Sequence, residues 1–316
     1  MYKKFINKLT CPQCKRDLKI KKIFLAKKDK ITYGFLKCRC HLYPILDGIL
    51  FIRRDKPLKT FFVFLILKIV PFKYFSFKQF ISLVSHLRLI NKEWASYLIN
   101  RFKGKDFFPA AITSTLIKKN ENVLDAGCGM GHLIYLLKLT MAEENICGLD
   151  HSLVNLYLSK SYACNNCNYI YTDLNQRLPF KSKSFQKIIS SDVFHYIANK
   201  KLLGKEFKRI LTNKGLIALT NLHNKHFSQH FTDPVDCPKT PQDYIKFFPN
   251  LNFSLFSQEH SHKGVLKRVR EKDFSSEANK PKTFTLIFSK SKKLQRDIQT
   301  NLTTLIPKDS QLVSTA

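Results

Sequence analysis

The feature that most limits what this chain can fold into is a glycine-rich loop between an apolar strand and a helix. It reads Asn122-Val123-Leu124-Asp125-Ala126-Gly127-Cys128-Gly129-Met130-Gly131-His132. Glycine permits positive φ angles and lets the backbone approach a ligand without a Cβ in the way. A helix that opens directly after such a loop offers free backbone N–H groups. The segment therefore predicts a ligand site at the end of a strand in an α/β fold.

Asp125 narrows the choice of ligand. A glycine-rich turn alone is weak evidence, because dinucleotide-binding folds use one between their first strand and helix. Here an acid precedes the first glycine. It would repel a pyrophosphate, whereas it suits a ligand that carries an ammonium and a sulfonium. We infer that the cofactor is S-adenosylmethionine.

Two later apolar runs also end in acids. Asp150 ends Ile146-Cys147-Gly148-Leu149-Asp150, 25 residues after Asp125. A carboxylate at that strand tip can accept hydrogen bonds from both ribose hydroxyls. Asp173 and Leu174 follow the third run, 169–172, where a polar acceptor beside an apolar side chain suits adenine. Open α/β sheets bind ligands at these carboxyl ends, so we expect the three acids to share one site.

Short apolar runs alternate with longer amphipathic ones from residue 109 to about 290. The pattern favours a doubly wound, mostly parallel sheet with helices on both faces. We also expect a closing antiparallel pair formed by 252–256 with 283–288.

Residues 109 to 220 resemble a class I S-adenosylmethionine-dependent methyltransferase of the ubiquinone/menaquinone-type group. Besides the loop, the resemblance rests on Leu178-Pro179-Phe180 with Ser184-Phe185, on 188–197 and on 206–216. It implies a seven-stranded Rossmann-like sheet. The predicted cofactor-binding residues are Asp125, Gly127, Gly129, Gly131, Asp150, His151, Asp173, Leu174 and Ser191.

The turn after the fourth expected strand bears on the reaction. It reads Ser191-Asp192-Val193-Phe194, without the Asn/Asp-Pro-Pro-aromatic motif of base-amino methyltransferases or the Pro-Cys of carbon-5 cytosine enzymes. Direct in-line displacement at the sulfonium methyl remains, with the protein supplying proximity and orientation. His195 is the candidate proton acceptor, since an imidazole titrates near neutral pH. The alternative is that His195 merely begins a helix beside the cofactor.

The amino-terminal cysteines form a second motif. Cys11-Pro12-Gln13-Cys14 is followed, 24 residues after Cys14, by Cys38-Arg39-Cys40-His41. Paired cysteines with such a spacer are typical of a zinc ribbon. The predicted ligands are Cys11, Cys14, Cys38 and Cys40, with His41 as an alternative to Cys40 for the fourth position. The segment resembles the zinc-ribbon family of methyltransferase activators, which also occur as fused amino-terminal modules. A further pair, Cys164 and Cys167, has no matching pair nearby and is read as ordinary thiols.

The net charge of the chain indicates which kinds of molecule it could bind. The chain has 54 Lys and Arg against 23 Asp and Glu, a net charge of +31, and residues 1 to 60 hold 17 of these basic residues and 4 of the acidic ones. Such an excess favours RNA or an anionic membrane surface, although compositional drift toward Lys explains it equally well. The Phe-rich segment from Phe61 to Phe80 is either an interfacial element or a helix packed over the sheet.

We divide the chain into a zinc-ribbon-like module (1–54), a basic linker with Phe-rich helices (55–108), a methyltransferase domain (109–290) and a polar, disordered tail (291–316). No run is long enough to span a bilayer and no signal peptide is recognisable, so we expect a cytoplasmic protein. The leading function is methyl transfer to a small or lipid-like acceptor. The alternatives are a ribosomal RNA base methyltransferase that docks through the zinc module, and a non-catalytic scaffold.

Overall fold

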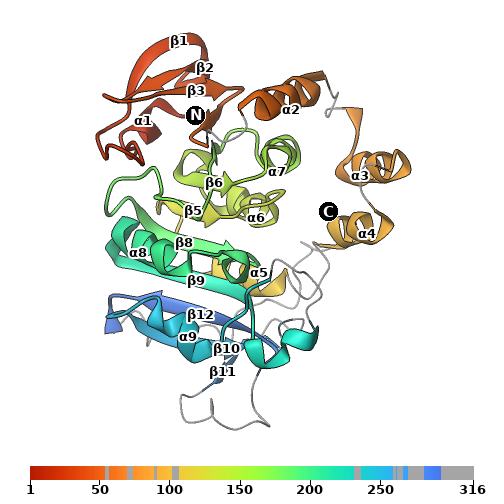
Figure 1. The fold of residues 1–316 in the computed structure, drawn as a ribbon, viewed down its shortest axis with the longest axis vertical. Coiled ribbons are helices and arrows are strands. Elements are labelled where there is room, and N and C mark those ends of the chain that lie inside the picture. Colours follow the sequence, from red (N-terminus) through yellow and green to blue (C-terminus); the bar gives the residue numbers. More distant parts are fainter. Residues whose placement is uncertain are drawn as a thin grey trace.

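A computed structural model gives the fold of the chain (Figure 1). It describes residues 1–53, 57–69, 74–88, 91–101, 107–230, 236–258, 261, 266–269 and 281–292. The predicted tail lies outside these residues from 293 onward, and so do residues 55–56, 70–73, 89–90 and 102–106 of the predicted linker segment.

The strands of the described residues join into one sheet of twelve strands, in the order β1-β2-β3-β4-β7-β6-β5-β8-β9-β12-β10-β11. Their bounds are β1 Lys19–Lys27, β2 Lys30–Lys37, β3 Leu42–Leu46, β4 Ile49–Phe51, β5 Val123–Ala126, β6 Ile146–Asp150, β7 Asn168–Tyr171, β8 Phe185–Ser191, β9 Leu211–His223, β10 Asn252–Ser257, β11 Lys267–Val269 and β12 Thr283–Ser289.

The expected seven-stranded sheet is thus corrected to a mixed twelve-stranded one. Its centre keeps the expected pattern, because β7, β6, β5, β8 and β9 are all parallel. The predicted closing pair is confirmed: β10 and β12 are antiparallel, with Asn252 opposite Ser289. The extra strands come mainly from the amino terminus. There β4 pairs in parallel with β7, so the cysteine-bearing hairpins extend the sheet and cover what would otherwise be an open edge.

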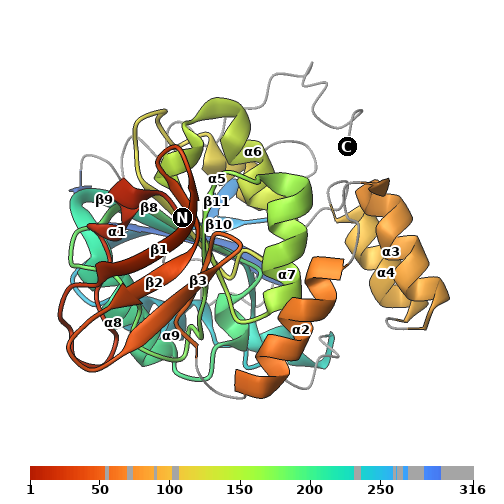
Figure 2. The same cartoon turned by 90° about the horizontal axis from the view of Figure 1, so that it is seen from above.

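Helices cover both faces of the sheet (Figures 1 and 2). On one face lie α1 (Lys3–Ile6), α8 (Lys200–Ile210) and α9 (Pro241–Lys246), which share a buried cluster with Leu124 and Ile188. On the other face lie α2 (Pro57–Ile69), α5 (Phe108–Ser114), α6 (His132–Thr140) and α7 (Leu153–Leu158), which pack around Val123 and Ile189. Neighbouring strand residues thus point to opposite cores, as expected for a sheet buried on both sides.

The amino-terminal segment packs directly on the rest of the chain. Phe5 of α1 meets the rings of Phe180 and Phe185 at centroid distances of 6.3 and 6.4 Å. Residues from both parts belong to one buried cluster. The hairpins and the central sheet therefore share a continuous hydrophobic core.

Besides α5, three helices lie between the hairpins and the central sheet in the described part of the chain. They are α2, α3 (Phe77–His86) and α4 (Lys92–Asn100). Ser76 caps α3 through a complete capping box with Gln79. The inner side of the α3–α4 pair packs Ile81, Ala95 and Leu98 near Met130 of the glycine loop. None of the helices in the described residues is long and apolar enough to span a bilayer.

Candidate active site

The glycine loop has the predicted geometry. Gly127, Gly129 and Gly131 have φ angles of 80°, 51° and 84°. A Cβ on Gly127 would come within 2.6 Å of the Val193 side chain, whereas one on Gly129 would meet no atom within 4 Å. Gly127 therefore permits close packing of two loops, and Gly129 leaves open space in front of the backbone.

The open space beside the loop forms a cleft with two adjoining lobes. The first lobe, about 150 Å³, is lined by Asp125, Ser191 and residues of α4 and α5. The second, about 790 Å³, is lined by Asp150, His151 and residues that follow β7 and β8. Gly127 and Gly129 line both lobes. The cleft thus lies at the carboxyl ends of the parallel strands, where open α/β sheets bind ligands.

Eight of the nine predicted cofactor residues line this cleft. They are Asp125, Gly127, Gly129, Ser191, Asp150, His151, Asp173 and Leu174. The ninth, Gly131, is the N-cap of α6. The structure therefore brings together residues that are spread over 67 positions of the sequence, from 125 to 191.

The two acids at the tips of β5 and β6 have different surroundings. Asp150 accepts hydrogen bonds from the Gly129 N–H at 2.8 Å and the Ser152 N–H at 2.7 Å, so it fixes the loop and the start of α7. Asp125 is buried, and its Oδ2 has no hydrogen-bond partner among the described residues. Burial, with the nearby Asp150 charge, raises the pKa of Asp125 to about 8. Without a compensating cation among the described residues, the Asp125 carboxyl is therefore mostly protonated at neutral pH.

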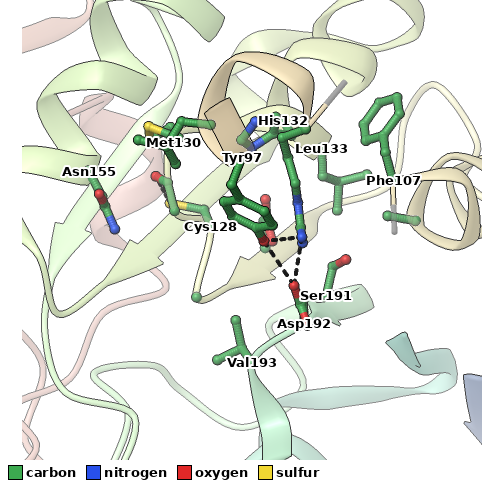
Figure 3. Close-up of a pocket in the computed structure, with 16 residues that line it drawn as sticks. Tyr97, Phe107, Cys128, Met130, His132, Leu133, Asn155, Ser191, Asp192 and Val193 are labelled. Carbon is green, nitrogen blue, oxygen red and sulfur yellow. Dashed lines mark hydrogen bonds and ion pairs between the residues drawn. The ribbon is translucent and has the colours of Figure 1, made fainter. Parts of the chain in front are cut away.

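Helix α4 covers the first lobe (Figure 3). Arg101 lies 2.7 Å from Oδ2 of Asp192, and the Tyr97 hydroxyl donates to the same oxygen at 3.2 Å. Burial alone would raise the pKa of Asp192, but Arg101 holds it below its ordinary value. Asp192 has a φ of 60°, which aims the turn after β8 at this cover. No sequence motif marked Tyr97 and Arg101.

His195 lies behind the cleft. It is fully buried and is not among the residues that line either lobe. Its ring stacks on His223 at a centroid distance of 3.9 Å, and its Nε2 lies 3.7 Å from Oδ1 of Asp192. Burial and the adjacent His223 lower the pKa of His195 to about 3, so its ring is neutral at physiological pH.

His223 occupies the position nearer the cleft. It ends β9, lines the second lobe, and its Nδ1 lies 2.5 Å from Oδ2 of Asp236. Neither His223 nor Asp236 was predicted from the sequence. The usable signal for His223 was its place at the carboxyl end of a parallel strand, whereas Asp236 follows a connection with no recognisable pattern.

The amino-terminal cysteines gather in one place. The Sγ atom of Cys40 lies 3.7 Å from that of Cys11 and 3.5 Å from that of Cys38. The backbone N–H of Cys14 donates to the Cys11 Sγ at 3.4 Å. The His41 Nδ1 lies 2.9 Å from the Cys40 Sγ. The ligand atoms of Cys11, Cys38, Cys40 and His41 all lie within 4.8 Å of one another, and Cys14 is not part of this group.

The remaining cysteines have no such surroundings. Cys128, Cys147, Cys164 and Cys167 are buried, and Cys237 is exposed. None belongs to the groups of three or more metal-ligating side chains that occur in the described part of the chain.

The comparisons with known proteins agree with this geometry. Residues 117–293, more than half of the chain, match the family described as "Methyltransferase domain". A curated relative, N-methyltransferase 4 of Papaver somniferum, is 25% identical over 121 residues, which are 36% of this chain and 34% of that protein. The match thus spans about a third of the relative's length.

Two solved structures are similar to part of this chain. One, described as a possible histamine N-methyltransferase of Thermotoga maritima, is 13% identical with a TM-score of 0.48, over 65% of this chain and 97% of the other. The other belongs to the complex between the Trm112 methyltransferase activator of Haloferax volcanii and a methyltransferase. It is 17% identical with a TM-score of 0.46, over 60% and 93% of the two chains. On its family match, the chain belongs to the methyltransferase domain family.

Proposed function

We propose that this methyltransferase modifies a small or lipid-like acceptor by direct in-line displacement. The observation that carries the proposal is the covered cleft, in which Tyr97 of α4 and Arg101, just after α4, contact Asp192 across the first lobe. Leu98 and Phe107 add apolar surface to the same lobe. A lobe of about 150 Å³ beneath such a cover suits a compact reacting group, whereas a folded polymer needs an open groove.

In this proposal, Asp125 binds the ammonium group of the cofactor beside the glycine loop. Its buried oxygen without a partner in the described residues supports the assignment, because a buried acceptor is costly unless a ligand supplies the missing contact. Asp150 accepts hydrogen bonds from the ribose hydroxyls. Its two backbone contacts leave capacity for this, since a carboxylate has about four acceptor positions.

The rest of the predicted set completes the cofactor site. Asp173 and Leu174 take the adenine amine and ring face, with His151 at the rim and Ser191 near the reacting end. Gly131 shapes the start of α6. The support is the common position of the side chains along the second lobe and at the tip of β8.

The bound cofactor supplies an electrophilic methyl group. The protein orients the acceptor, excludes water and takes up a proton where the acceptor must lose one. We assign proton uptake to His223, because Asp236 faces its Nδ1 and thereby makes Nε2 the basic nitrogen. His195 is then a positioning residue, stacked behind His223.

We further propose that the cysteine cluster holds a structural Zn²⁺ through Cys11, Cys14, Cys38 and Cys40. Sulfur atoms bound to one tetrahedral zinc are about 3.8 Å apart, since Zn–S bonds are about 2.3 Å long. The measured separations of 3.5 and 3.7 Å fit this spacing. His41 is assigned the supporting role of donating to the Cys40 sulfur.

An RNA acceptor is the second candidate, and strand β1 favours it. All nine of its residues are exposed, and its sequence Lys-Ile-Lys-Lys-Ile-Phe-Leu-Ala-Lys alternates cations with apolar groups. The Lys22 ammonium lies over the exposed Phe24 ring at 5.1 Å. Such a surface suits a polyanion with stacking bases.

One experiment separates the two acceptors. The purified full-length protein is incubated with methyl-labelled S-adenosylmethionine and separate lipid, RNA and protein fractions of a cell extract. We expect label in the lipid or small-molecule fraction, and the Asp150→Ala variant gives the background. Label confined to RNA, together with binding that weakens steeply as salt rises, would overturn the proposed acceptor.

A further inference from the structure

Helix α2 has apolar side chains on two opposite sides. Its inner side is fixed by Phe64 and Leu67, each 7% exposed; the Phe64 ring lies 6.3 Å from that of Phe51 and 6.1 Å from that of Tyr157. The outer side carries six large apolar residues that are 41 to 81% exposed. They are Leu58, Phe61, Phe62, Leu65, Ile66 and Ile69. We call these six residues the α2 stripe.

The α2 stripe follows helical spacing. Its members recur at intervals of three, one, three, one and three residues, so they share one side of the helix. A contiguous apolar surface of this kind is uncommon on monomeric proteins and marks an interaction site. Leu139 of α6, by contrast, is 51% exposed and has no other exposed large apolar residue on its helix in the described set.

The charge around the stripe identifies the kind of partner. Residues 57 to 88 contain five Lys and Arg and no Asp or Glu. Lys68, beside the stripe, lies 3.6 Å from Asp47, while Lys78 and Arg88 of the next segment are exposed. An apolar helix side whose own segment carries cations and no acidic residue is typical of helices that lie in the interface of an anionic bilayer.

The position of the stripe connects it with the cleft. Arg53, just before α2, lines the second lobe, and Tyr97 of α4 lines both lobes. The segment from Arg53 to Tyr97, which includes α2, therefore has residues that line the cleft at both of its ends. Figures 1 and 2 both show α2, α3 and α4 along one side of the molecule.

We propose that the α2 stripe docks this enzyme on an anionic membrane surface, with α2 lying in the plane of the interface. A bilayer suits the stripe better than a folded protein does, since a single helix side is convex and a fluid apolar layer needs no complementary groove. Docking would bring the cleft next to the bilayer. The route of a lipid-like acceptor from bilayer to cleft rests on the proposed function, whereas the docking itself does not.

Vesicle flotation tests the proposal with the full-length protein and no cofactor. The vesicles contain phosphatidylcholine alone, or phosphatidylcholine mixed with phosphatidylglycerol. We expect the wild type to float with the mixed vesicles, and less so as salt rises. Replacing Phe61→Ser and Phe62→Ser together should weaken vesicle binding at least about tenfold. The matched control Leu139→Ser, whose side chain is 51% exposed, should bind like the wild type.

Three outcomes would overturn the docking proposal. The first is a wild type that does not float with mixed vesicles. The second is a double variant that binds vesicles as the wild type does. The third is a stripe that serves a second copy of the chain, seen as a wild-type dimer that the double variant dissociates while vesicle binding is absent. Calorimetric titration of both proteins with S-adenosylmethionine, without vesicles, verifies folding and tests the methyltransferase site separately.

Discussion

The cleft and the cysteine cluster each bring together side chains that destabilise one another when no ligand is bound. The two differ in the structure that holds those side chains in place. In the cleft, Asp125 and Asp150 sit at the tips of strands that are buried on both sides. In the cluster, the cysteines lie in two short connections, around residues 11–15 and 38–41, at the edge of the hairpins. The acids are thus positioned by a hydrophobic core that forms without them. The cysteine side chains are positioned mainly by contacts among their own sulfur atoms.

This difference indicates what each ligand contributes. The cofactor should add binding energy to a frame that already exists. A metal ion should add local structure, because the connections around the cysteines bury few apolar side chains. Substitutions in the cleft should therefore change the affinity for the cofactor and the rate of methyl transfer. Substitutions in the cysteine cluster should instead change how well the connections around residues 11–15 and 38–41 are ordered. Four substitutions test this difference between the cleft and the cysteine cluster, in order of decreasing expected effect.

Loss of the metal should have the largest effect. Structural zinc contributes about 10–16 kcal/mol of apparent binding free energy. We expect Cys38→Ser to lose its bound zinc and the hydrogen-exchange protection of residues 10–18 and 37–43, while the central sheet stays protected. Metal analysis and hydrogen-exchange mass spectrometry measure both. Cys237→Ser, at an exposed cysteine outside the cluster, is the control. Full zinc content in Cys38→Ser would refute the ligand assignment.

His223→Ala should lower kcat about 100-fold or more where the acceptor must lose a proton, since general base catalysis contributes about 10²–10⁴-fold. Because the imidazole touches the cleft but not the predicted cofactor contacts, KM for the cofactor should stay nearly unchanged. His195→Asn should cause a smaller loss of kcat and shift the pH profile, as expected of a positioning residue. Equal kcat for wild type and His223→Ala would eliminate His223 as the proton acceptor.

Asp150→Ala should weaken cofactor binding about 10- to 150-fold. The estimate corresponds to hydrogen bonds with a charged acceptor, which are worth about 1.5–3 kcal/mol. Isothermal titration calorimetry measures the affinity, and Asp243→Asn, at a partly exposed acid on α9, serves as the matched control. If Asp150→Ala bound the cofactor as tightly as the control does, the assignment of Asp150 to the ribose hydroxyls would be wrong.

Asp125→Asn should stabilise the cofactor-free protein at high pH. The folded-state pKa of Asp125, about 8, exceeds the ordinary value of 3.8, so its contribution to stability is fully present below 3.8 and is lost as the pH rises to 8. We expect little difference from the wild type at pH 4. At pH 9 the variant should be about 1–3 kcal/mol more stable in denaturant unfolding. A difference that does not depend on pH would contradict the raised pKa.

The residues that could be predicted from sequence are those whose role is set locally. The glycines, and the acids at strand tips such as Asp150, follow directly from strand and loop order, because parallel strands align their carboxyl ends. The convergence of the cysteines follows from metal-ligand spacing. The antiparallel pairing of β10 with β12 was recognisable from two isolated apolar runs near the end of the fold.

The residues that escaped prediction depend on long-range packing. The pairing of β4 with β7 joins positions 120 residues apart, since Leu50 lies opposite Ile170, and nothing in a three-residue strand indicates its partner. Tyr97 and Arg101 reach the cleft only because the α3–α4 pair folds back on the glycine loop. The α2 stripe could not be distinguished from a buried helix either, since both sides of the helix are apolar and only the fold decides which one is covered.

The central claim is that the cofactor's ammonium lies against Asp125, and the proton balance of binding tests it most directly. Calorimetric titration with S-adenosylmethionine at pH 6.5, in two buffers of different ionisation enthalpy, counts the protons released. An acid with a pKa of about 8 is protonated before binding and ionised when it pairs with a cation. The account predicts release of about one proton per cofactor for the wild type and close to none for Asp125→Asn. Tight binding without proton release by the wild type would contradict it.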